Sequence, residues 1–367
     1  MALRLAVIAG DGIGPEVVDQ ALRVLDAVAL KHGLETSSQR FPFSAGHYLE
    51  TGHVLEPADL DELRKFDAIL LGAVGGQPND PRLAGGVIEK GILLKLRFEL
   101  DQYINLRPVK LYPGIETPIK GKSADDIDFV VVRENTEDLY CGLGGILREG
   151  TPNEVANQTM VASRFGVERC VRYAFEAAVA RKAAGYPGKL TLVHKTNVLN
   201  FAGATWLRTF KEVAAEFDGI ETGYQHVDAC CMFMVTRPED YDVIVVPNMF
   251  GDIITDLGAA IAGGMGIASS GNLDPTGSTP SMYEPVHGSA PDIAGQDKAN
   301  PIATIDTLAL LLRETGRIKD DSAMVAAGDA VAAAVQAVTP EFAGKSLDRS
   351  GYGCAEVGSM VIEALGQ

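Results

Sequence analysis

The sequence predicts an α/β fold of two domains, in which a parallel or mixed sheet is flanked by helices and no Rossmann motif is present. Short apolar, β-branched runs alternate with longer helical segments along the chain, which is typical of such sheets. The 367 residues are enough for two domains with a large core. We expect one domain from residues 1–102 and 263–367 and the other from 103–262, with the active site between them.

The first predicted strand, 3–9, leads through the glycine turn 10–16 into a helix that runs to about residue 32. This turn differs from the Rossmann fingerprint, because Pro15 stands where the third glycine belongs. The remaining predicted strands lie at 68–72, 104–107 (ended by Pro108), 129–133, 190–194 and 241–247, with one more that closes at 226–228. Further helices are predicted from 91–97, over 165–184 and over 248–262.

Composition excludes several classes of function. The net charge of −17 argues against a nucleic-acid partner and against an anionic membrane surface. The five cysteines show no C-x-x-C spacing, so we expect reduced thiols in a cytoplasmic protein. No apolar run approaches eighteen residues, and the apolar start meets Asp11, which indicates a first strand rather than a transmembrane helix or a signal peptide.

Two aspartates mark the predicted helix 248–262, for which Asn248 is a suitable N-cap. Asp252 and Asp256 stand at i and i+4, so both carboxylates project from one face, one turn apart. Such a pair is either an exposed acidic face or a site for a hard divalent cation, Mg²⁺ or Mn²⁺. The spacing alone leaves both interpretations open.

Three arginines, Arg97, Arg107 and Arg133, each lie at the edge of a predicted element, where open α/β sheets place their sites. Each alone is typical of a surface arginine. Together they would form a pocket for a dicarboxylate, because guanidinium pairs bidentately with carboxylate.

With these residues in view, the chain resembles the β-decarboxylating dehydrogenases, the family of isopropylmalate, isocitrate, homoisocitrate and tartrate dehydrogenases, and comes nearest to its isopropylmalate branch. The resemblance runs nearly end to end. The motifs that carry it are GDGIGPE at 10–16, LLKLR at 93–97, NLRP at 105–108, RENTEDLY at 133–140, HKTN at 194–197, VD at 227–228, NMFGDIITD at 248–256 and EPVHGSAPDIAG at 284–295.

The resemblance implies a role for each site residue. Asp252 and Asp256 resemble the metal ligands, with Asp228 of the other subunit of a homodimer as the third. Lys195, also contributed across the dimer, resembles the general base for the substrate hydroxyl, and Tyr140 resembles the acid that protonates the carbanion after CO₂ leaves. The substrate-binding residues implied are Arg97, Arg107, Arg133, Leu93, Leu94, Asn197, Asp228 and Asp252.

The segment from Glu284 to Asn300 resembles the cofactor loop of the family. Its small residues allow the backbone to approach phosphates. The resemblance places Asp292 against the adenosine ribose hydroxyls, and a carboxylate there repels a 2′-phosphate, so we expect NAD rather than NADP. The cofactor contacts implied are Ile13, Glu284, His287, Gly288, Ser289, Ala290, Asp292 and Asn300.

The expected activity is NAD-dependent and Mg²⁺- or Mn²⁺-dependent oxidative decarboxylation of a 3-substituted malate. We expect 3-isopropylmalate, converted to 2-oxoisocaproate in leucine biosynthesis, because Ile92, Leu93 and Leu94 would offer an apolar wall to the substituent on C3.

Alternatives within the family are homoisocitrate, isocitrate, tartrate or another alkyl- or arylmalate. The segment 133–140 resembles the homoisocitrate and NAD-isocitrate branch, and its polar Asn135 and Asp138 matter only if they reach the pocket. Outside the class, a non-catalytic regulatory subunit is the alternative. The presence of Lys195, Tyr140 and the three aspartates argues against it.

Overall fold

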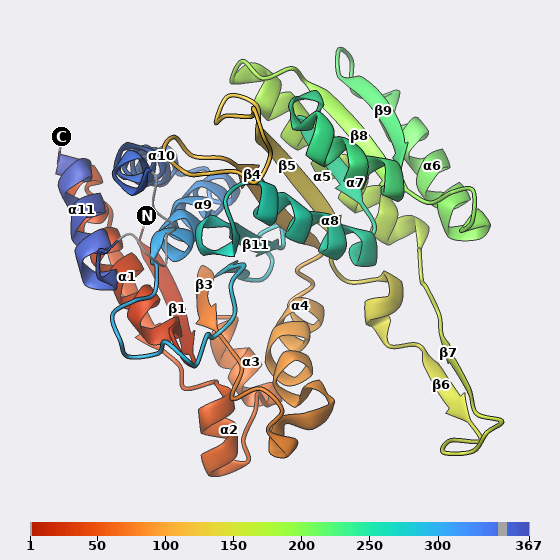
Figure 1. Ribbon diagram of the computed structural model, residues 1–367, viewed down its shortest axis with the longest axis horizontal. Coiled ribbons are helices and arrows are strands. Elements are labelled where there is room, and N and C mark those ends of the chain that lie inside the picture. Colours follow the sequence, from red (N-terminus) through yellow and green to blue (C-terminus); the bar gives the residue numbers. More distant parts are fainter. Residues whose placement is uncertain (1, 344–350, 367) are drawn as a thin grey trace. The chain divides into compact units, whose positions relative to one another are not determined.

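A computed structural model describes residues 2–343 and 351–366 of the chain. Its packing divides into two compact units (Figure 1). Unit 1 comprises Met1–Gln102, Lys110–Asp125 and Ala259–Gln367, and unit 2 comprises Tyr103–Val109 and Asp126–Gly258.

The bounds of unit 1 differ from the expected domain by residues 259–262, where the last part begins earlier, and by the segment Lys110–Asp125. This segment is held by hydrogen bonds within unit 1. The Tyr112 hydroxyl donates to the Asp306 carboxylate over 2.7 Å, and the Thr117 hydroxyl donates to the Ile261 carbonyl over 2.6 Å.

Unit 1 contains a mixed sheet in the order β2-β1-β3-β12-β11. The strands are β1 (Leu3–Gly10), β2 (Thr36–Arg40), β3 (Ala68–Ala73), β11 (Ser269–Leu273) and β12 (Ser281–Pro285). The pairs β1–β2, β1–β3 and β3–β12 are parallel, whereas β11 and β12 are antiparallel. Every residue of β3 is buried, which fits the continuous apolar run of a strand covered on both faces.

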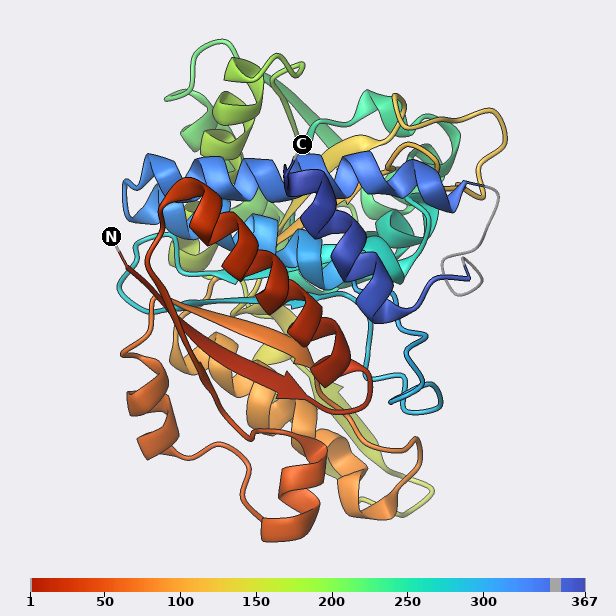
Figure 2. The ribbon, with the colours of Figure 1, turned by 90° about the vertical axis from the view of Figure 1, so that its left-hand side faces the viewer.

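Helices cover this sheet (Figure 2). One group, α1 (Gly14–His32), α9 (Ile302–Ile318), α10 (Ser322–Val338) and α11 (Cys354–Gly366), packs together and against β3 and β12. The other group packs into one apolar cluster with Ala6 and Ile8 of β1. It consists of α2 (Ala45–Thr51), α3 (Pro57–Leu63), a π-helical turn η2 (Glu89–Leu94) and α4 (Lys95–Glu99).

The helical run Ser322–Phe342 is long and apolar enough to cross a membrane by length and composition. Its residues Ala327, Val331 and Val335 are fully buried, and α10 packs against α9 and α11. These contacts place one face of α10 in the core of unit 1, and 44% of the apolar window is buried.

Unit 2 contains the strand order β4-β5-β10-β8-β9. These strands are β4 (Ile104–Lys110), β5 (Asp128–Glu134), β8 (Lys189–His194), β9 (Glu221–His226) and β10 (Val243–Val246), and β5, β10, β8 and β9 pair in parallel. The helices are α5 (Arg164–Ala183), α6 (Asn200–Ala214), α7 (Val227–Thr236) and the start of α8 (Asn248–Ile261), with 3₁₀ turns η3 (Asp138–Cys141) and η4 (Pro238–Asp240).

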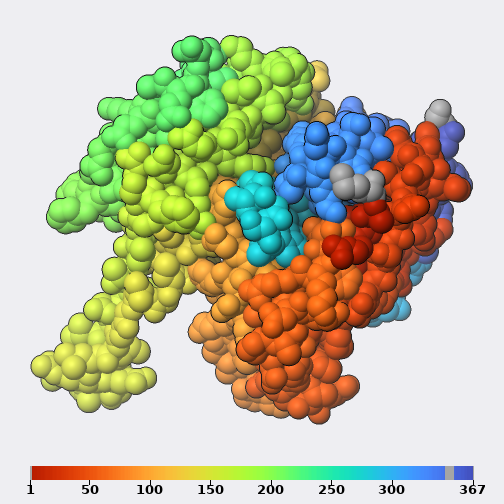
Figure 3. Space-filling view, turned by 180° about the vertical axis from the view of Figure 1, so that it is seen from behind, coloured from red at the N-terminus to blue at the C-terminus, as the bar shows by residue number. Residues whose placement is uncertain are grey.

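An antiparallel hairpin of β6 (Gly144–Leu147) and β7 (Val155–Gln158) projects from the rest of unit 2 (Figure 3). All eight strand residues of the hairpin are exposed. A two-stranded ribbon with no buried face is marginal by itself.

The α/β fold with a mixed sheet is confirmed, and the predicted elements lie close to their expected positions. Two ends differ. The strand β4 continues through Pro108 to Lys110, and Asp228 lies in the first turn of α7 rather than at the end of a strand.

Candidate active site

The end of β5, the turn η3 and the first turns of α8 bring three charged or polar side chains of unit 2 together. Arg133 is almost fully buried, and its Nη1 donates to Oδ1 of Asp252 over 2.6 Å. The Tyr140 hydroxyl donates to Oδ2 of Asp252 over 2.9 Å. Asn248 also orients the guanidinium of Arg133, because its Oδ1 accepts from Nε and Nη2.

Asp256, the second aspartate of α8, forms an ion pair with Arg107. Nη1 of Arg107 lies 3.7 Å from Oδ1 of Asp256, and Nε of Arg107 donates to Asn105 over 2.9 Å. The repulsion expected between Asp252 and Asp256 is therefore compensated by long-range arginines rather than by neighbours on the helix.

The two aspartates fit a hard divalent cation in donor chemistry. Their side chains are 40% and 66% exposed, so both retain accessible oxygen. A carboxylate offers about four lone-pair directions, so Asp252 can accept from Arg133 and Tyr140 and also bind a cation. Asp252 and Asp256 would hold Mg²⁺ or Mn²⁺ through oxygen, the ligand type that both ions prefer.

The protonation state of Tyr140 is set by its surroundings. Burial raises the pKa of the Tyr140 hydroxyl above its usual value; the Arg133 charge lowers it and the Asp252 charge raises it. The hydroxyl is therefore protonated at neutral pH and is a proton donor. Arg133, whose guanidinium lies 5.2 Å from the ring centroid, would stabilise the anion that remains after donation.

The predicted base lies at the end of β8. Nζ of Lys195 lies 2.7 Å from Oδ1 of Asp228, and this ion pair lowers the pKa of the Asp228 carboxyl. Asn197 lies in the exposed turn after β8. Asp228, Asp252 and Asp256 do not gather into one group of potential ligands within residues 2–343 and 351–366.

The two polar residues that distinguish the 133–140 segment are buried. Asn135 is 1% and Asp138 is 2% exposed. The Asp138 carboxylate accepts backbone N–H groups of Leu139 and Met249, each over 2.8 Å. Asp138 thus caps the start of α8, a role that the sequence assigned to Asn248, and it does not offer its charge to a ligand.

In unit 1, Arg97 is 7% exposed and lies in α4. Its Nη2 donates to Oε1 of Glu284 over 3.2 Å, and Glu284 also accepts from Asn272 over 2.8 Å. Nε of Arg97 is buried and has no hydrogen-bond partner among the described residues, so this guanidinium retains a donor for an anion.

The segment before Arg97 differs from a regular helix. Leu93 and Leu94 are partly exposed and lie on the π-helical turn η2, a form that is frequent at functional sites. Ile92 is fully buried in the apolar cluster under β1. Of the three apolar residues expected to face a substituent, Leu93 and Leu94 therefore keep surface to offer, and Ile92 does not.

The loop predicted to bind the cofactor packs on the turn after β1. The Ile13 N–H donates to the Ser289 carbonyl over 2.8 Å, and the Ile13 side chain is buried with Ala290 and Ala299. Gly12 has a φ of 58°, and a Cβ there would lie 1.9 Å from the Ser289 oxygen. Only glycine allows this approach of two backbones.

One residue of this turn was missed from the sequence. The Asp11 carboxylate accepts the backbone N–H groups of Ala45, Gly46 and Gly75 over 2.7 to 3.0 Å. It thereby joins the turn after β1 to the start of α2 and to the turn after β3. An aspartate between two turn glycines is a known signal for this kind of backbone bonding.

Two predicted cofactor contacts keep polar atoms for a ligand. Nε2 of His287 and Nδ2 of Asn300 are buried and have no partner in the described part of the chain. Burial lowers the pKa of His287, so its ring is neutral near pH 7. Ser289 is buried, whereas Gly288 and Asp292 are exposed, and this combination fits a ligand that is part embedded and part open to solvent.

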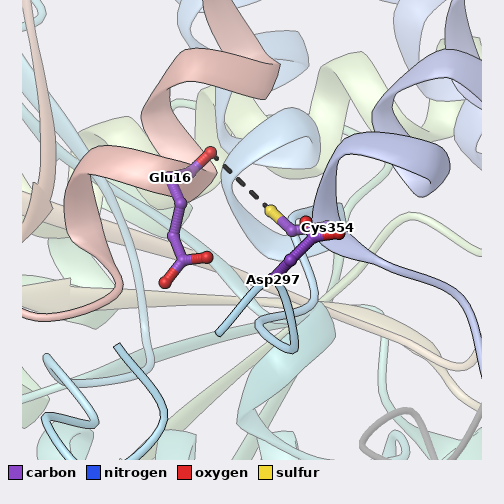
Figure 4. Close-up of side chains that lie close together, drawn as sticks. All are labelled: Glu16, Asp297 and Cys354. Carbon is purple, nitrogen blue, oxygen red and sulfur yellow. Dashed lines mark hydrogen bonds between the residues drawn. The ribbon is translucent and has the colours of Figure 1, made fainter. Parts of the chain in front are cut away.

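The carboxyl and thiol groups of Glu16, Asp297 and Cys354 form the one cluster of potential metal ligands found in the described residues (Figure 4). Burial raises the pKa of the Cys354 thiol to about 12, so the thiol is protonated at neutral pH. Glu16 accepts from the Gly295 N–H, and Asp297 accepts from the Ala355 N–H. The cluster anchors the loop that ends at Asn300 to α1 and α11.

Residues 4–361 match the family described as isocitrate/isopropylmalate dehydrogenase. The chain is 54% identical to a 3-isopropylmalate dehydrogenase of Clavibacter michiganensis over 99% of this chain and 98% of that protein, and 56% identical to one of Thermobifida fusca over 86% of each. The crystal structure of isocitrate dehydrogenase from Methylococcus capsulatus covers 100% of both chains with a TM-score of 0.84 and 32% identity. The chain belongs to the isocitrate/isopropylmalate dehydrogenase family.

Proposed function

We propose that the chain catalyses the NAD-dependent and divalent-metal-dependent oxidative decarboxylation of 3-isopropylmalate in leucine biosynthesis. The observation that carries the chemistry is the contact of Asp252 with both Arg133 and Tyr140. It brings together a carboxylate suited to bind a metal ion, a cation suited to bind a substrate carboxylate and a proton donor. Relatives at 53–56% identity are named 3-isopropylmalate dehydrogenases, which supports this substrate.

The side chains divide the work as follows. Arg107 and Arg133 bind carboxylate oxygen of the malate, and Nε of Arg97 is available for another. Lys195 takes the proton of the C2 hydroxyl, and Tyr140 returns a proton to carbon after CO₂ has left. When bound, NAD accepts the hydride from C2 and the metal polarises the C2 oxygen.

The regulatory-subunit alternative is disfavoured by the same contacts. A binding subunit needs neither the Lys195–Asp228 pair nor the Tyr140–Asp252 pair.

The cofactor assignment rests on unit 1. Nδ2 of Asn300 is buried without a partner among the described residues and fits a hydrogen-bond acceptor of a nucleotide. Nε2 of His287 is likewise buried without a partner there and fits a hydrogen-bond donor, because Nδ1 of the neutral ring donates to the Gly288 carbonyl. The exposed Asp292 carboxylate favours NAD over NADP, because it accepts ribose hydroxyls and repels a phosphate. All five cysteines are free, which accords with the proposed cytoplasmic location.

We place the active site at a homodimer interface. Large apolar side chains are exposed on unit 2, which is typical of a surface that binds another subunit. They are Leu143, Ile146, Leu147 and Val155 on the hairpin and Val198, Phe201, Met232, Val235 and Ile253 on the turn after β8 and on α6, α7 and α8. Lys195 and Asp228 would then complete the site of the partner subunit.

Subunit mixing tests this sharing. Lys195→Met and Tyr140→Phe chains are inactive or slow alone, but a mixed dimer holds one site with both residues intact if Lys195 acts across the interface. After denaturation and refolding together we expect roughly a quarter of wild-type activity. If mixing restores nothing while the mixed dimers form, Lys195 acts within its own subunit.

A substrate panel with NAD⁺ and Mg²⁺ tests the substrate. We expect the kcat/KM for 3-isopropylmalate to exceed the values for isocitrate, homoisocitrate, tartrate and malate. The third carboxylate of isocitrate or homoisocitrate against Leu93 and Leu94 loses water without gaining a partner, and tartrate and malate carry no alkyl group that could pack there. Leu94→Arg should shift the preference toward tricarboxylates by about tenfold or more. Leu30→Arg, at an exposed position of α1, is the control. Faster turnover of any of the four polar substrates by wild type would overturn the leucine-pathway assignment.

A further inference from the structure

Asp138 joins the turn that carries Tyr140 to the helix that carries Asp252, both in unit 2. It is the first residue of η3, two residues before Tyr140. Its Oδ1 accepts the Leu139 N–H and its Oδ2 accepts the Met249 N–H at the start of α8, each over 2.8 Å. One carboxylate therefore holds both segments.

The backbone of Asp138 is fixed as well. Its N–H donates to the Val161 carbonyl over 3.0 Å, and the Val161 N–H donates back over 3.4 Å. Its φ of 68° lies in the left-handed region, which costs a residue with a Cβ about 1 kcal/mol and which aspartate tolerates better than most. Glycine would adopt this backbone more easily, so the side chain is the reason for an aspartate here.

These contacts close a ring. From Asp138 the chain leads through Leu139 to Tyr140, whose hydroxyl donates to Asp252 over 2.9 Å. Met249 and Asp252 are three residues apart on α8, on adjacent turns of one face, and Met249 returns the ring to Asp138. The Asp138 carboxylate thus closes the ring opposite the Tyr140–Asp252 hydrogen bond and constrains the distance between these two side chains.

We propose that Asp138 is a positioning residue that fixes the Tyr140 hydroxyl against Asp252 for proton transfer to the substrate carbon. The inference rests on the proposed function of Tyr140 as the acid. Asp138 is buried and its oxygens are bound to backbone N–H groups, so it acts through Tyr140 rather than on the substrate.

Two variants test this role. Asp138→Gly keeps the backbone conformation and removes the carboxylate, and Asp138→Asn keeps one acceptor. We expect Asp138→Gly to lower kcat about ten- to a hundredfold, with both KM values and the metal requirement within about threefold of wild type. The first turnover of NADH formation should keep its rate, and Asp138→Asn should fall between. Asp320→Gly, an exposed aspartate with a φ of 53° in unit 1, controls for the backbone change.

A double-mutant cycle separates positioning from a general loss of structure. Because Asp138 acts through Tyr140, the kcat of Asp138→Gly/Tyr140→Phe should equal that of Tyr140→Phe within about twofold. The inference would be overturned if the losses in kcat of the two single variants multiplied in the double variant. It would also be overturned if first-turnover NADH formation slowed as much as kcat. If Asp138→Gly does not fold, the milder Asp138→Asn serves for the same cycle. Failure of wild type to reduce NAD⁺ with any 3-substituted malate would instead contradict the proposed function.

Discussion

The two units hold their site residues by different means. In unit 2 the residues are charged side chains in pairs, Arg133 with Asp252, Arg107 with Asp256 and Lys195 with Asp228. In unit 1 the Arg97 guanidinium pairs with Glu284, but the proposed cofactor contacts His287 and Asn300 lie on a loop and keep buried nitrogens that have no partner among the described residues. The paired charges of unit 2 are oriented before a ligand arrives, whereas the polar atoms of unit 1 are completed by one. We therefore expect changes in unit 2 to act on the chemical step and changes in unit 1 to act on binding.

The largest effect is expected from Asp252→Asn in unit 2. It neutralises both the proposed metal ligand and the carboxylate that accepts from Tyr140, and we expect kcat/KM to fall by about a thousandfold or more. Millimolar Mg²⁺ or Mn²⁺ should not restore it, although both ions should restore wild type after chelation. Asp218→Asn, on the exposed surface of unit 2, is the control. Full wild-type activity in excess chelator would rule out the metal site.

The second test separates two steps within unit 2. Lys195→Met should stop NADH formation and CO₂ release alike, because the hydroxyl proton has no acceptor. Tyr140→Phe should still reduce NAD⁺ in the first turnover but lose about a hundredfold or more in kcat, since protonation after CO₂ loss becomes slow. Stopped-flow absorbance of NADH and CO₂ release measure the two steps. A wild-type rate for Tyr140→Phe would remove it from the mechanism.

The sequence could predict the features that depend on neighbouring residues, but not those that depend on residues far apart in the chain. The strand β3 is evident in an apolar run, and the shared face of Asp252 and Asp256 follows from the helical period, because both signals are local. The partners of these aspartates are not local. Arg133 stands 119 residues from Asp252, and no pattern in either segment specifies the pair.

The capping of α8 shows how a local signal gives the wrong residue. Asn248 is a good N-cap by type and position, yet its side chain accepts from Arg133 and the Met249 N–H is bound by Asp138, 111 residues earlier. The positive φ of Asp138 and the π-helical turn at Glu89–Leu94 likewise have no signature in the sequence. Such conformations are imposed by packing at a site and not by intrinsic propensity.

A smaller effect is expected from Asp292→Lys in unit 1. The reversed charge should attract a 2′-phosphate, so the preference for NAD over NADP should narrow by roughly tenfold or more, mainly through KM. The kcat with NAD should change little. Asp292 is exposed and is proposed to bind the cofactor, whereas the charge pairs of unit 2 are proposed to carry the chemical step. Initial rates with both cofactors measure this. Should kcat fall more than KM rises, the assignment of unit 1 residues to binding fails.

The last effect concerns stability and not turnover. Burial raises the pKa of Glu134, which follows Arg133 at the end of β5, to about 7, although backbone N–H groups of Thr136 and Glu137 donate to it. The folded protein thus holds this proton more tightly than the unfolded chain, whose carboxyl has a pKa near 4.5. Stability from this group is complete below the unfolded value and is lost as pH rises to about 7, by roughly 3 kcal/mol.

Substitution of Glu134 by glutamine should remove this pH dependence. We expect the free energy of urea unfolding to fall between pH 5 and pH 7 in wild type and to change less in Glu134→Gln, at fixed protein concentration. Glu149→Gln, the same substitution at an exposed position of the hairpin, is the control and should keep the wild-type slope. Equal slopes for Glu134→Gln and wild type would show that Glu134 is ionised in the folded protein. In that case the buried end of β5 carries a charge beside Glu137, and the loop to Tyr140 is held against the repulsion between these two carboxylates.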